Sequence, residues 1–238
     1  MTKREIKAMR RMEKYERTRQ GSNSSNLTKW IIIALGSALF LAFFGFVIIL
    51  IKQSKNKPVE ISSAGWVRGS KDAKTTLVEY GDFQCPACRA AEPFIRSAMK
   101  DFDGRLKFVF KHFPLTSIHP NAMLAARAAE AAGRQNKFFE MHDWLYDNQD
   151  SWAGLSGADA RAKMNDAAKA LKLDTDQFTK DMDSREIADK ISANQSEGIN
   201  LGVNSTPTFY LDNKKIDNNP QNYDDFKKLI SEEVKKVK

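Results

Sequence analysis

The chain contains two cysteines, Cys85 and Cys88, in the segment FQCPAC, and no other among its 238 residues. A pair at this spacing can form a disulfide, supply half of a zinc site or act as a reactive dithiol. A purely structural disulfide normally closes a longer loop, because the entropy that it removes from the unfolded chain grows with loop length. The spacing therefore favours redox chemistry over a structural cross-link.

Zinc is the main alternative use of the cysteine pair. His112 and His119 could complete a set of four ligands, but six residues separate them, outside the usual three to five. Pro86, directly after the first cysteine, also suits a redox-active helix start better than a metal site. We therefore expect neither a metal nor another cofactor. We expect His112 and His119 to be structural or to lie near the rim of the active site, and His142 to be an ordinary helix residue.

The elements around the cysteines predict an α/β fold. Residues 74–80 (KTTLVEY) are apolar and β-branched, as in a buried strand. A turn then leads into a helix over about 85–102, where Pro86 suits the first turn because its missing N–H costs nothing there. Residues 106–113 (LKFVFKHF) alternate and predict a second strand. Strand, helix and strand in this order form a βαβ unit with parallel strands.

The start of a helix makes a cysteine a better thiolate, because free amide groups and the helix dipole stabilise negative charge. Cys85 is then the exposed nucleophile, and Cys88, one turn later, is the buried resolving thiol. In the oxidised form a substrate thiolate attacks Cys85. A second substrate thiolate then releases the oxidised substrate and leaves the pair reduced.

The remainder of the chain is predicted to be mostly helical. Apolar residues recur at helical spacing from about 121 to 202, where Gly202 is a suitable helix stop. TPTFYLDNKKI predicts a hairpin that turns at Asp212 and Asn213. A last helix is predicted over about 223–235.

The segments EYGDFQCPAC, KHFPL and GVNSTPTF follow one another in this order, with helices between them. This combination resembles the DsbA-type thiol–disulfide oxidoreductases of the thioredoxin-fold superfamily, in a membrane-anchored bacterial form, from roughly Trp66 to the C-terminus. The resemblance implies a thioredoxin-like domain over 64–238. It also implies a helical insertion, at about 119–202, after the second strand.

The resemblance implies roles for individual residues near the cysteines. Cys85 and Cys88 match the redox pair, and Pro86 and Ala87 match the dipeptide that tunes its potential. Some strong oxidants carry a histidine in place of Ala87, so this departure leaves open how oxidising the pair is.

Two further features of the family have counterparts in this sequence. Thr206 and Pro207 match the loop whose proline is cis and faces the disulfide, with the Thr206 backbone available to a substrate peptide. Glu79 matches a buried acid beneath the active site, where proton transfer with Cys88 is one reason to tolerate a costly buried carboxyl. An outward-facing strand residue is the alternative for Glu79. Glu92 matches a second acidic position near the site, and a solvated helix residue is its alternative.

The N-terminal part predicts a membrane anchor over 30–52. Residues 31–51 are uncharged and long enough for a hydrocarbon core of roughly 30 Å. Nine Lys and Arg precede this stretch, which places the arm (1–29) in the cytoplasm and the large domain outside the cell membrane. A cleaved signal peptide is the alternative, but residues 51–60 (IKQSKNKPVE), which lead into the linker (53–63), offer no small-residue cleavage site.

The net charge of +8 belongs to the arm rather than to the large domain. Residues 1–52 carry ten Lys and Arg against three Glu, whereas residues 53–238 carry 28 basic against 27 acidic residues. We therefore expect the arm to face membrane lipid, and we do not expect a nucleic-acid partner.

The combined prediction is a DsbA-like oxidoreductase with a redox-active centre, attached by a signal anchor and working where the environment is oxidising. It would donate disulfides to reduced secreted or membrane proteins. Because each turnover leaves the pair reduced, the resemblance implies a membrane partner of the DsbB or VKOR type that reoxidises it. The alternatives are a reductase or isomerase that acts on misoxidised proteins, and a non-catalytic peptide-binding module.

Overall fold

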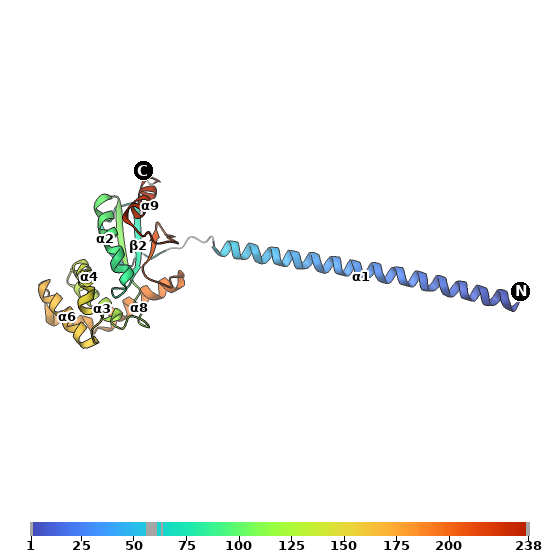
Figure 1. Cartoon of the computed structure of the whole chain (residues 1–238), viewed down its shortest axis with the longest axis horizontal. Coiled ribbons are helices and arrows are strands. Elements are labelled where there is room, and N and C mark those ends of the chain that lie inside the picture. The colour runs from blue at the N-terminus through green and yellow to red at the C-terminus, as the bar shows by residue number, and fades with distance from the viewer. Residues whose placement is uncertain (1, 56–60, 63, 237–238) are drawn as a thin grey trace. The chain divides into compact units, whose positions relative to one another are not determined.

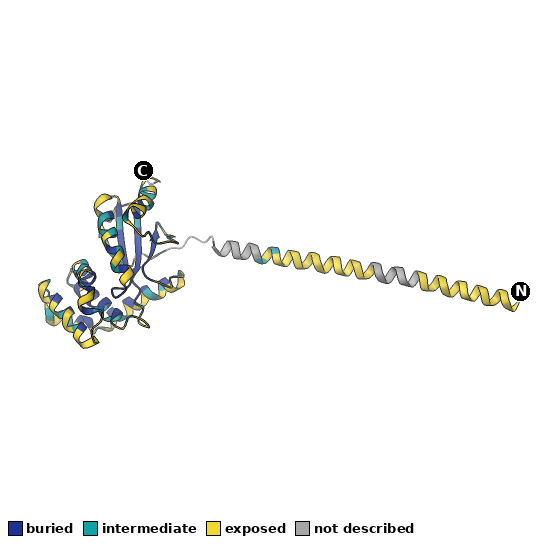
Figure 2. Ribbon diagram, viewed as in Figure 1, coloured by how far each residue is buried: buried dark blue, intermediate teal, exposed yellow. Residues whose placement is uncertain are grey.

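The described chain falls into two structural units. The structure is a computed structural model that describes residues 2–55, 61–62 and 64–236. The units are residues 1–58 and 59–238. Figure 2 shows that the second unit has a buried interior, whereas the described side chains of the first unit are mostly exposed.

The first unit contains one helix, α1 (Lys3–Lys55), at the blue end of Figure 1. Residues 28–47 of this helix are apolar and long enough to cross a membrane, and none of them is buried. An N-terminal apolar helix that could anchor in a membrane is therefore present. The expected arm and span are continuous parts of this helix. Of the expected linker, residues 56–60 and 63 lie outside the described residues.

The second unit is built on a five-stranded sheet in the order β1-β3-β2-β4-β5. The central strands β2 and β3 are parallel, as the βαβ pattern predicts. The strand β1, which the sequence analysis did not predict, pairs antiparallel with β3, and β4 pairs antiparallel with β2. The strands are β1 (Trp66–Gly69), β2 (Thr75–Gly81), β3 (Leu106–His112), β4 (Thr208–Leu211) and β5 (Lys214–Lys215).

Helices cover the sheet and extend beyond it. The helix α2 connects the parallel strands, six helices lie between β3 and β4, and α9 closes the chain, which confirms a thioredoxin-like α/β fold with added helical content. Figure 1 shows α3, α4 and α6 gathered beyond one end of the sheet. The helices are α2 (Pro86–Asp101), α3 (Ala122–Arg134), α4 (Phe138–Asp147), α5 (Gln149–Trp152), α6 (Gly157–Ala170), α7 (Thr175–Met182), α8 (Arg185–Asn200) and α9 (Tyr223–Lys236).

The central strands are buried on both faces. On one face Leu77 and Phe108 join Ile95 of α2 in the main core. On the other face Val78 and Val109 belong to a second, smaller core cluster. Six of the seven residues of β3 are buried, so the expected alternation of buried and exposed residues is wrong. The reason is that side chains pack against both faces of this strand, which leaves it without a solvated side.

The strand β1 is fixed to the helical insertion through Trp66. The indole stacks on Phe138 with ring centroids 4.5 Å apart, and its N–H donates to Glu130 Oε1 at 2.7 Å. A Cβ atom placed on Gly133 of α3 would lie 2.3 Å from this indole. The close approach of α3 to the ring therefore requires glycine at this position.

We predict that Gly133→Ala lowers the free energy of unfolding by about 1–2 kcal/mol, because the added methyl group overpacks the contact with Trp66. Helix propensity alone predicts the opposite, a gain of about 1 kcal/mol. Thermal unfolding of the full chain in mild detergent, followed by near-UV circular dichroism, measures the difference. Gly157→Ala is the matched control, since its Cβ would meet only Asn121 Oδ1 at 3.9 Å. Equal behaviour of the two variants would contradict the overpacking account.

Candidate active site

The two cysteines lie where β2 leads into α2. Cys85 is the N-cap residue of α2, Pro86 occupies the first helical position, and Cys88 lies in the first turn. Both cysteines are free thiols. Cys88 is fully buried, as predicted, but only 7% of Cys85 is exposed, so the prediction of an exposed nucleophile is wrong. The loop before β4 causes this burial, because the Thr206 carbonyl lies 3.3 Å from Cys85 Sγ.

The surroundings of Cys85 favour its thiolate. Its pKa is lowered from 9.0 to about 5, chiefly by a hydrogen bond with the Cys88 thiol, while burial acts in the opposite direction. The Thr206 side chain and the backbone N–H groups of Ala87 and Cys88 also lower the pKa by hydrogen bonding. These N–H groups belong to the first turn of α2, where helical amides have no intrahelical partner. The start of α2 thus stabilises the Cys85 thiolate although Ala87 carries no charge.

The pKa of the Cys88 thiol moves in the opposite direction. Burial raises it well above 9.0, and the hydrogen bond to Cys85 and the negative charge of Glu79 raise it further. The two sulfurs of one pair therefore have opposite tendencies. Cys85 is set up to carry negative charge, whereas Cys88 is set up to hold its proton.

Polar side chains clamp the loop that precedes Cys85. The buried Asp82 carboxylate accepts the Gln84 N–H at 2.8 Å and the Leu115 N–H at 2.9 Å, and it lies 2.7 Å from His119 Nδ1. Gln149 of α5 donates its side-chain amide to the carbonyl oxygens of Phe83 and Cys85, at 2.8 and 3.1 Å. Neither set of hydrogen bonds was predicted from the sequence, because Leu115, His119 and Gln149 are distant along the chain from this loop.

The loop before β4 forms the other side of the site. The Thr206–Pro207 peptide bond is cis, as the resemblance implied. Beside Pro207 is a hollow of about 190 Å³, and the side chain of Asn219 donates to the Pro207 carbonyl at 2.7 Å. The hollow lies between the start of α2 and this loop, and its apolar lining includes Ala87, Ala90, Ala91, Phe94, Pro207 and Phe209. An apolar side chain of an extended peptide would fit such a hollow.

Glu79 lies on β2 beneath the cysteine pair. It is fully buried, so its alternative as an outward-facing residue is wrong. Among the described residues neither carboxyl oxygen has a hydrogen-bond partner of normal geometry. Burial raises the Glu79 pKa well above 4.5, the charge of Glu92 adds to this rise, and interaction with the Cys88 thiol opposes it. Glu79 is therefore a buried carboxyl with a raised pKa whose interaction partner in the cysteine pair is the Cys88 thiol.

Glu92 is also buried rather than solvated, and it belongs to an ion-pair network. Its Oε1 lies 3.0 Å from Arg96 Nε, 3.7 Å from Arg68 Nη1 and 4.0 Å from His142 Nδ1. The Arg68 guanidinium also lies 2.6 Å from the Asp143 carboxylate. Glu92, His142 and Asp143 are the described His, Cys, Asp and Glu residues whose ligand atoms gather within 4.8 Å. Two guanidinium groups already supply positive charge to these carboxylates.

The three histidines have different partners, which residue spacing alone did not identify. His142 is fully buried among aromatic rings, with its ring centroid 5.0 Å from those of Phe110 and Tyr146. His112 Nε2 lies 3.0 Å from Glu130, and His119 pairs with Asp82. Both histidines of the alternative zinc set thus pair with carboxylates.

Several solved structures resemble this chain over nearly their whole length. Oxidised BdbD from Bacillus subtilis is 26% identical, with a TM-score of 0.64 over 72% of this chain and 94% of that chain. A thioredoxin-like oxidoreductase from Silicibacter pomeroyi is 25% identical, with a TM-score of 0.61 over 73% and 94%. Wolbachia pipientis alpha-DsbA1, at 22% identity, shares the fold with a TM-score of 0.64 over 74% and 94%.

The curated relatives have a different name. An Na(+)/H(+) antiporter NhaA of Salinispora arenicola is 42% identical over 150 residues, which are 63% of this chain and 22% of that protein. One from Mycolicibacterium vanbaalenii is 34% identical over 201 residues, 80% of this chain and 31% of that protein. The description expected from the sequence, a signal-anchored oxidoreductase, is therefore wrong for these curated relatives, which are named as ion antiporters. This chain spans only about a quarter of the length of such relatives.

The family itself follows from the domain that holds the site. Residues 62–232 match the family model described as Thioredoxin. This range contains the five-stranded sheet, the cysteine pair at the start of α2 and the cis-proline loop. The chain therefore belongs to the thioredoxin family, and its solved structural neighbours include DsbA-type thiol–disulfide oxidoreductases.

Proposed function

We propose that this protein is a thiol–disulfide oxidoreductase that donates disulfides to other proteins. The observation that carries the proposal is the placement of Cys85 at the N-cap of α2, one turn before Cys88 and against the cis-proline loop, which holds its pKa at about 5. A stabilised thiolate favours the reduced form of a dithiol pair, so the corresponding disulfide is a strong electron acceptor. The same stabilisation makes Cys85 a good leaving group when the substrate is released.

The proposed reaction starts from a Cys85–Cys88 disulfide. A substrate thiolate attacks Cys85 Sγ, forms a mixed disulfide and displaces the Cys88 sulfur with its electron pair. Cys88 then takes a proton, for which the neighbouring Glu79 carboxyl is the proposed donor. A second substrate thiolate attacks the substrate sulfur of the mixed disulfide, forms the substrate disulfide and expels the Cys85 thiolate. The substrate loses two electrons and the cysteine pair gains them.

The surroundings of the pair support a peptide substrate. The Thr206 carbonyl faces Cys85 Sγ, although only 9% of this residue is exposed. An extended substrate strand that reaches Cys85 would therefore lie along this loop. The hollow between α2 and Pro207 would accept an apolar substrate side chain. Pro86 and Ala87 would tune the potential through the backbone donors at the start of α2, and Glu92 would act on Glu79 through its charge.

The proposed setting is the outer face of the cell membrane. We propose that the basic arm stays in the cytoplasm and that the apolar stretch 28–47 spans the bilayer, because Lys and Arg concentrate before it. The substrates would be reduced secreted or membrane proteins. Two electrons must leave the reduced pair after each turnover, so the partner would be a membrane oxidoreductase of the DsbB or VKOR type.

The proposed function predicts different fates for two single-cysteine variants. Cys88→Ser should accumulate a mixed disulfide with a substrate, because Cys85 is free to form it and no resolving thiol remains. Cys85→Ser should form no such adduct, since Cys88 is fully buried. The full chain in detergent is mixed with a disulfide-containing unfolded protein, and the adducts are counted on a non-reducing gel.

The wild-type disulfide form should oxidise a reduced substrate one for one. Oxidation of that substrate by Cys85→Ser would contradict the proposal.

The low Cys85 pKa predicts the pH dependence of alkylation. In the reduced full chain, one cysteine should react with iodoacetamide with a half-maximal rate near pH 5. Below that pH Cys85 is protonated and unreactive, and at pH 7 the thiolate is in about a hundredfold excess over the thiol. Cys88 should stay unmodified at neutral pH, because its pKa is raised and its sulfur is buried. A midpoint near pH 9 would contradict the account.

The buried carboxyl predicts a rate effect that is separate from the Cys85 titration. Glu79→Gln keeps the shape of the side chain and removes the proton donor, so disulfide donation at neutral pH should slow by roughly 100-fold. The Cys85 alkylation midpoint should stay near pH 5, since Glu79 is not among the groups that set it. Stopped-flow tryptophan fluorescence measures the rate. Glu140→Gln, a change to a carboxylate on α4, is the control. Unchanged kinetics in Glu79→Gln would exclude this role.

A further inference from the structure

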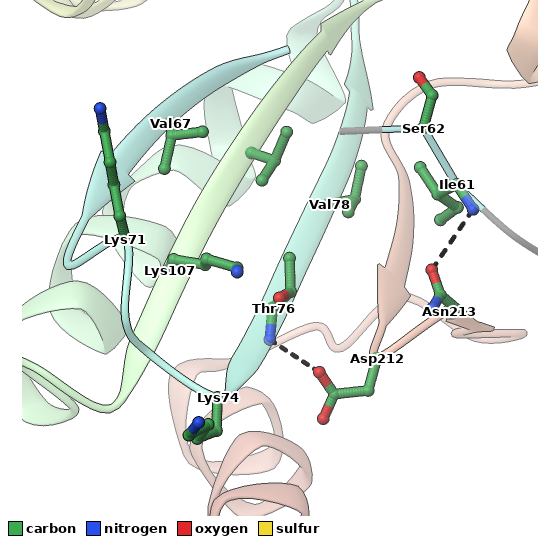
Figure 3. A pocket seen from close by; sticks show the side chains of 11 residues that line it. Ile61, Ser62, Val67, Lys71, Lys74, Thr76, Val78, Lys107, Asp212 and Asn213 are labelled. Carbon is green, nitrogen blue, oxygen red and sulfur yellow. Dashed lines mark hydrogen bonds between the residues drawn. The ribbon is translucent and has the colours of Figure 1, made fainter. Parts of the chain in front are cut away.

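A second site lies on the sheet face opposite the main core. It is a hollow of about 620 Å³, within the size range of small-molecule pockets. The strand register builds its floor, because Val67, Val109 and Val78 are directly paired across β1, β3 and β2. Gly69, Lys107 and Thr76 form the next row on the same face. Figure 3 labels Val67, Val78, Thr76 and Lys107 among the side chains of these rows, with Ile61 beside Val78.

No helix of the second unit, as far as its described residues go, covers this part of the sheet face. The helix α8 lies over the other end of the face, where a Cβ on Gly198 would meet Phe113 at 2.8 Å and Tyr80 at 3.0 Å. Val67 is consequently 38% exposed, although it belongs to a row of valines whose other members are buried. The hollow also lies at the start of β2, whereas the cysteines follow its end. It is therefore separate from the candidate active site.

The hollow is apolar at its floor and basic at its rim. Lys71, Lys74 and Lys107 line it, and in the described part of the chain no carboxylate lies within ion-pair distance of their ammonium groups. Asp212 is the acidic residue of the described lining, and its carboxylate already accepts the Thr76 N–H at 2.7 Å (Figure 3). The described part of the lining thus has a net charge of +2 from three lysines and one aspartate.

We propose that this hollow binds an anionic membrane lipid, with an acyl segment on the valine floor and the acidic headgroup among the three lysines. The apolar floor suits hydrocarbon, and the unpaired lysines suit a phosphate. Ile61 and Ser62, which form one wall, follow the apolar stretch of α1 by 14 residues. Even fully extended, these 14 residues span only about 50 Å, so the hollow stays within about 50 Å of the end of the apolar stretch. This second function does not depend on the disulfide chemistry.

Photo-crosslinking of the full chain in lipid nanodiscs tests the proposal. Phosphatidylglycerol with a photoreactive acyl chain is incorporated, and the labelled residues are mapped by mass spectrometry. We expect label on peptides that contain Val67, Val78 or Val109, in addition to label on α1. Photoreactive phosphatidylcholine should label α1 alone, because its headgroup has no net charge to offer the lysines.

Variants separate the hollow from general attraction to the membrane. Replacing Lys71, Lys74 and Lys107 by Gln should reduce label in the hollow roughly tenfold or more, as expected for the loss of three contacts with an anionic headgroup. The matched control replaces three other exposed lysines by Gln, with the same loss of charge, and should label as the wild type does. These lysines are Lys163, Lys180 and Lys228.

A single change on the floor provides an independent variant. Val67→Asp places a carboxylate in the hollow at a partly exposed edge position, so the sheet should tolerate it, and label should again fall. Near-UV circular dichroism and the rate of disulfide donation should stay unchanged in all these variants. Equal labelling by the two lipids, or equal loss of label in the lysine control, would overturn the proposal. So would label on α1 alone, as expected if the hollow instead receives an acidic segment of another protein.

Discussion

The contact between the Cys85 sulfur and the start of α2 is the interaction on which the rest of the site depends. The Cys88 thiol and the free backbone N–H groups stabilise a Cys85 thiolate only if the sulfur is held against them, and contacts from other segments hold it there. Gln149 fixes the carbonyl of Cys85, Asp82 fixes the preceding turn, and Thr206 closes the site from a segment 121 residues away. The parallel pair of β2 and β3 gives these segments a common edge at which to meet.

The site also contains carboxyl groups that are costly to bury. Glu92 is compensated, because the guanidinium groups of Arg96 and Arg68 lie within ion-pair distance. Glu79 has no such partner among the described residues, and burial holds its pKa well above 4.5. Burial favours the protonated form of such a carboxyl, and the fold bears the cost of desolvating it. Proton transfer with the high-pKa Cys88 thiol is the use that we propose for it. Burial raises the pKa of Cys88, whereas hydrogen bonds lower that of Cys85, so the two sulfurs differ.

Local patterns predicted the parts of this protein that depend on local physics. The βαβ unit, the cysteine at a helix start and the buried Cys88 follow from residue spacing, and the family resemblance added the cis-proline loop. The missed parts depend on contacts between distant segments. The strand β1 has only four residues and relies on Trp66 reaching the helical insertion. The exposure of Cys85 was wrong for the same reason, since Thr206 covers it from far along the chain.

The reduction potential of the cysteine pair shows whether the pair donates disulfides, because stabilisation of the Cys85 thiolate must appear as stabilisation of the reduced form. The full chain in detergent is equilibrated with defined ratios of reduced and oxidised glutathione, and the fraction of free thiol is measured. We expect a potential between about −120 and −180 mV, as in disulfide donors and isomerases. A value near about −270 mV, as in thioredoxin, would mean that electrons flow from this pair to its substrates and would contradict the account.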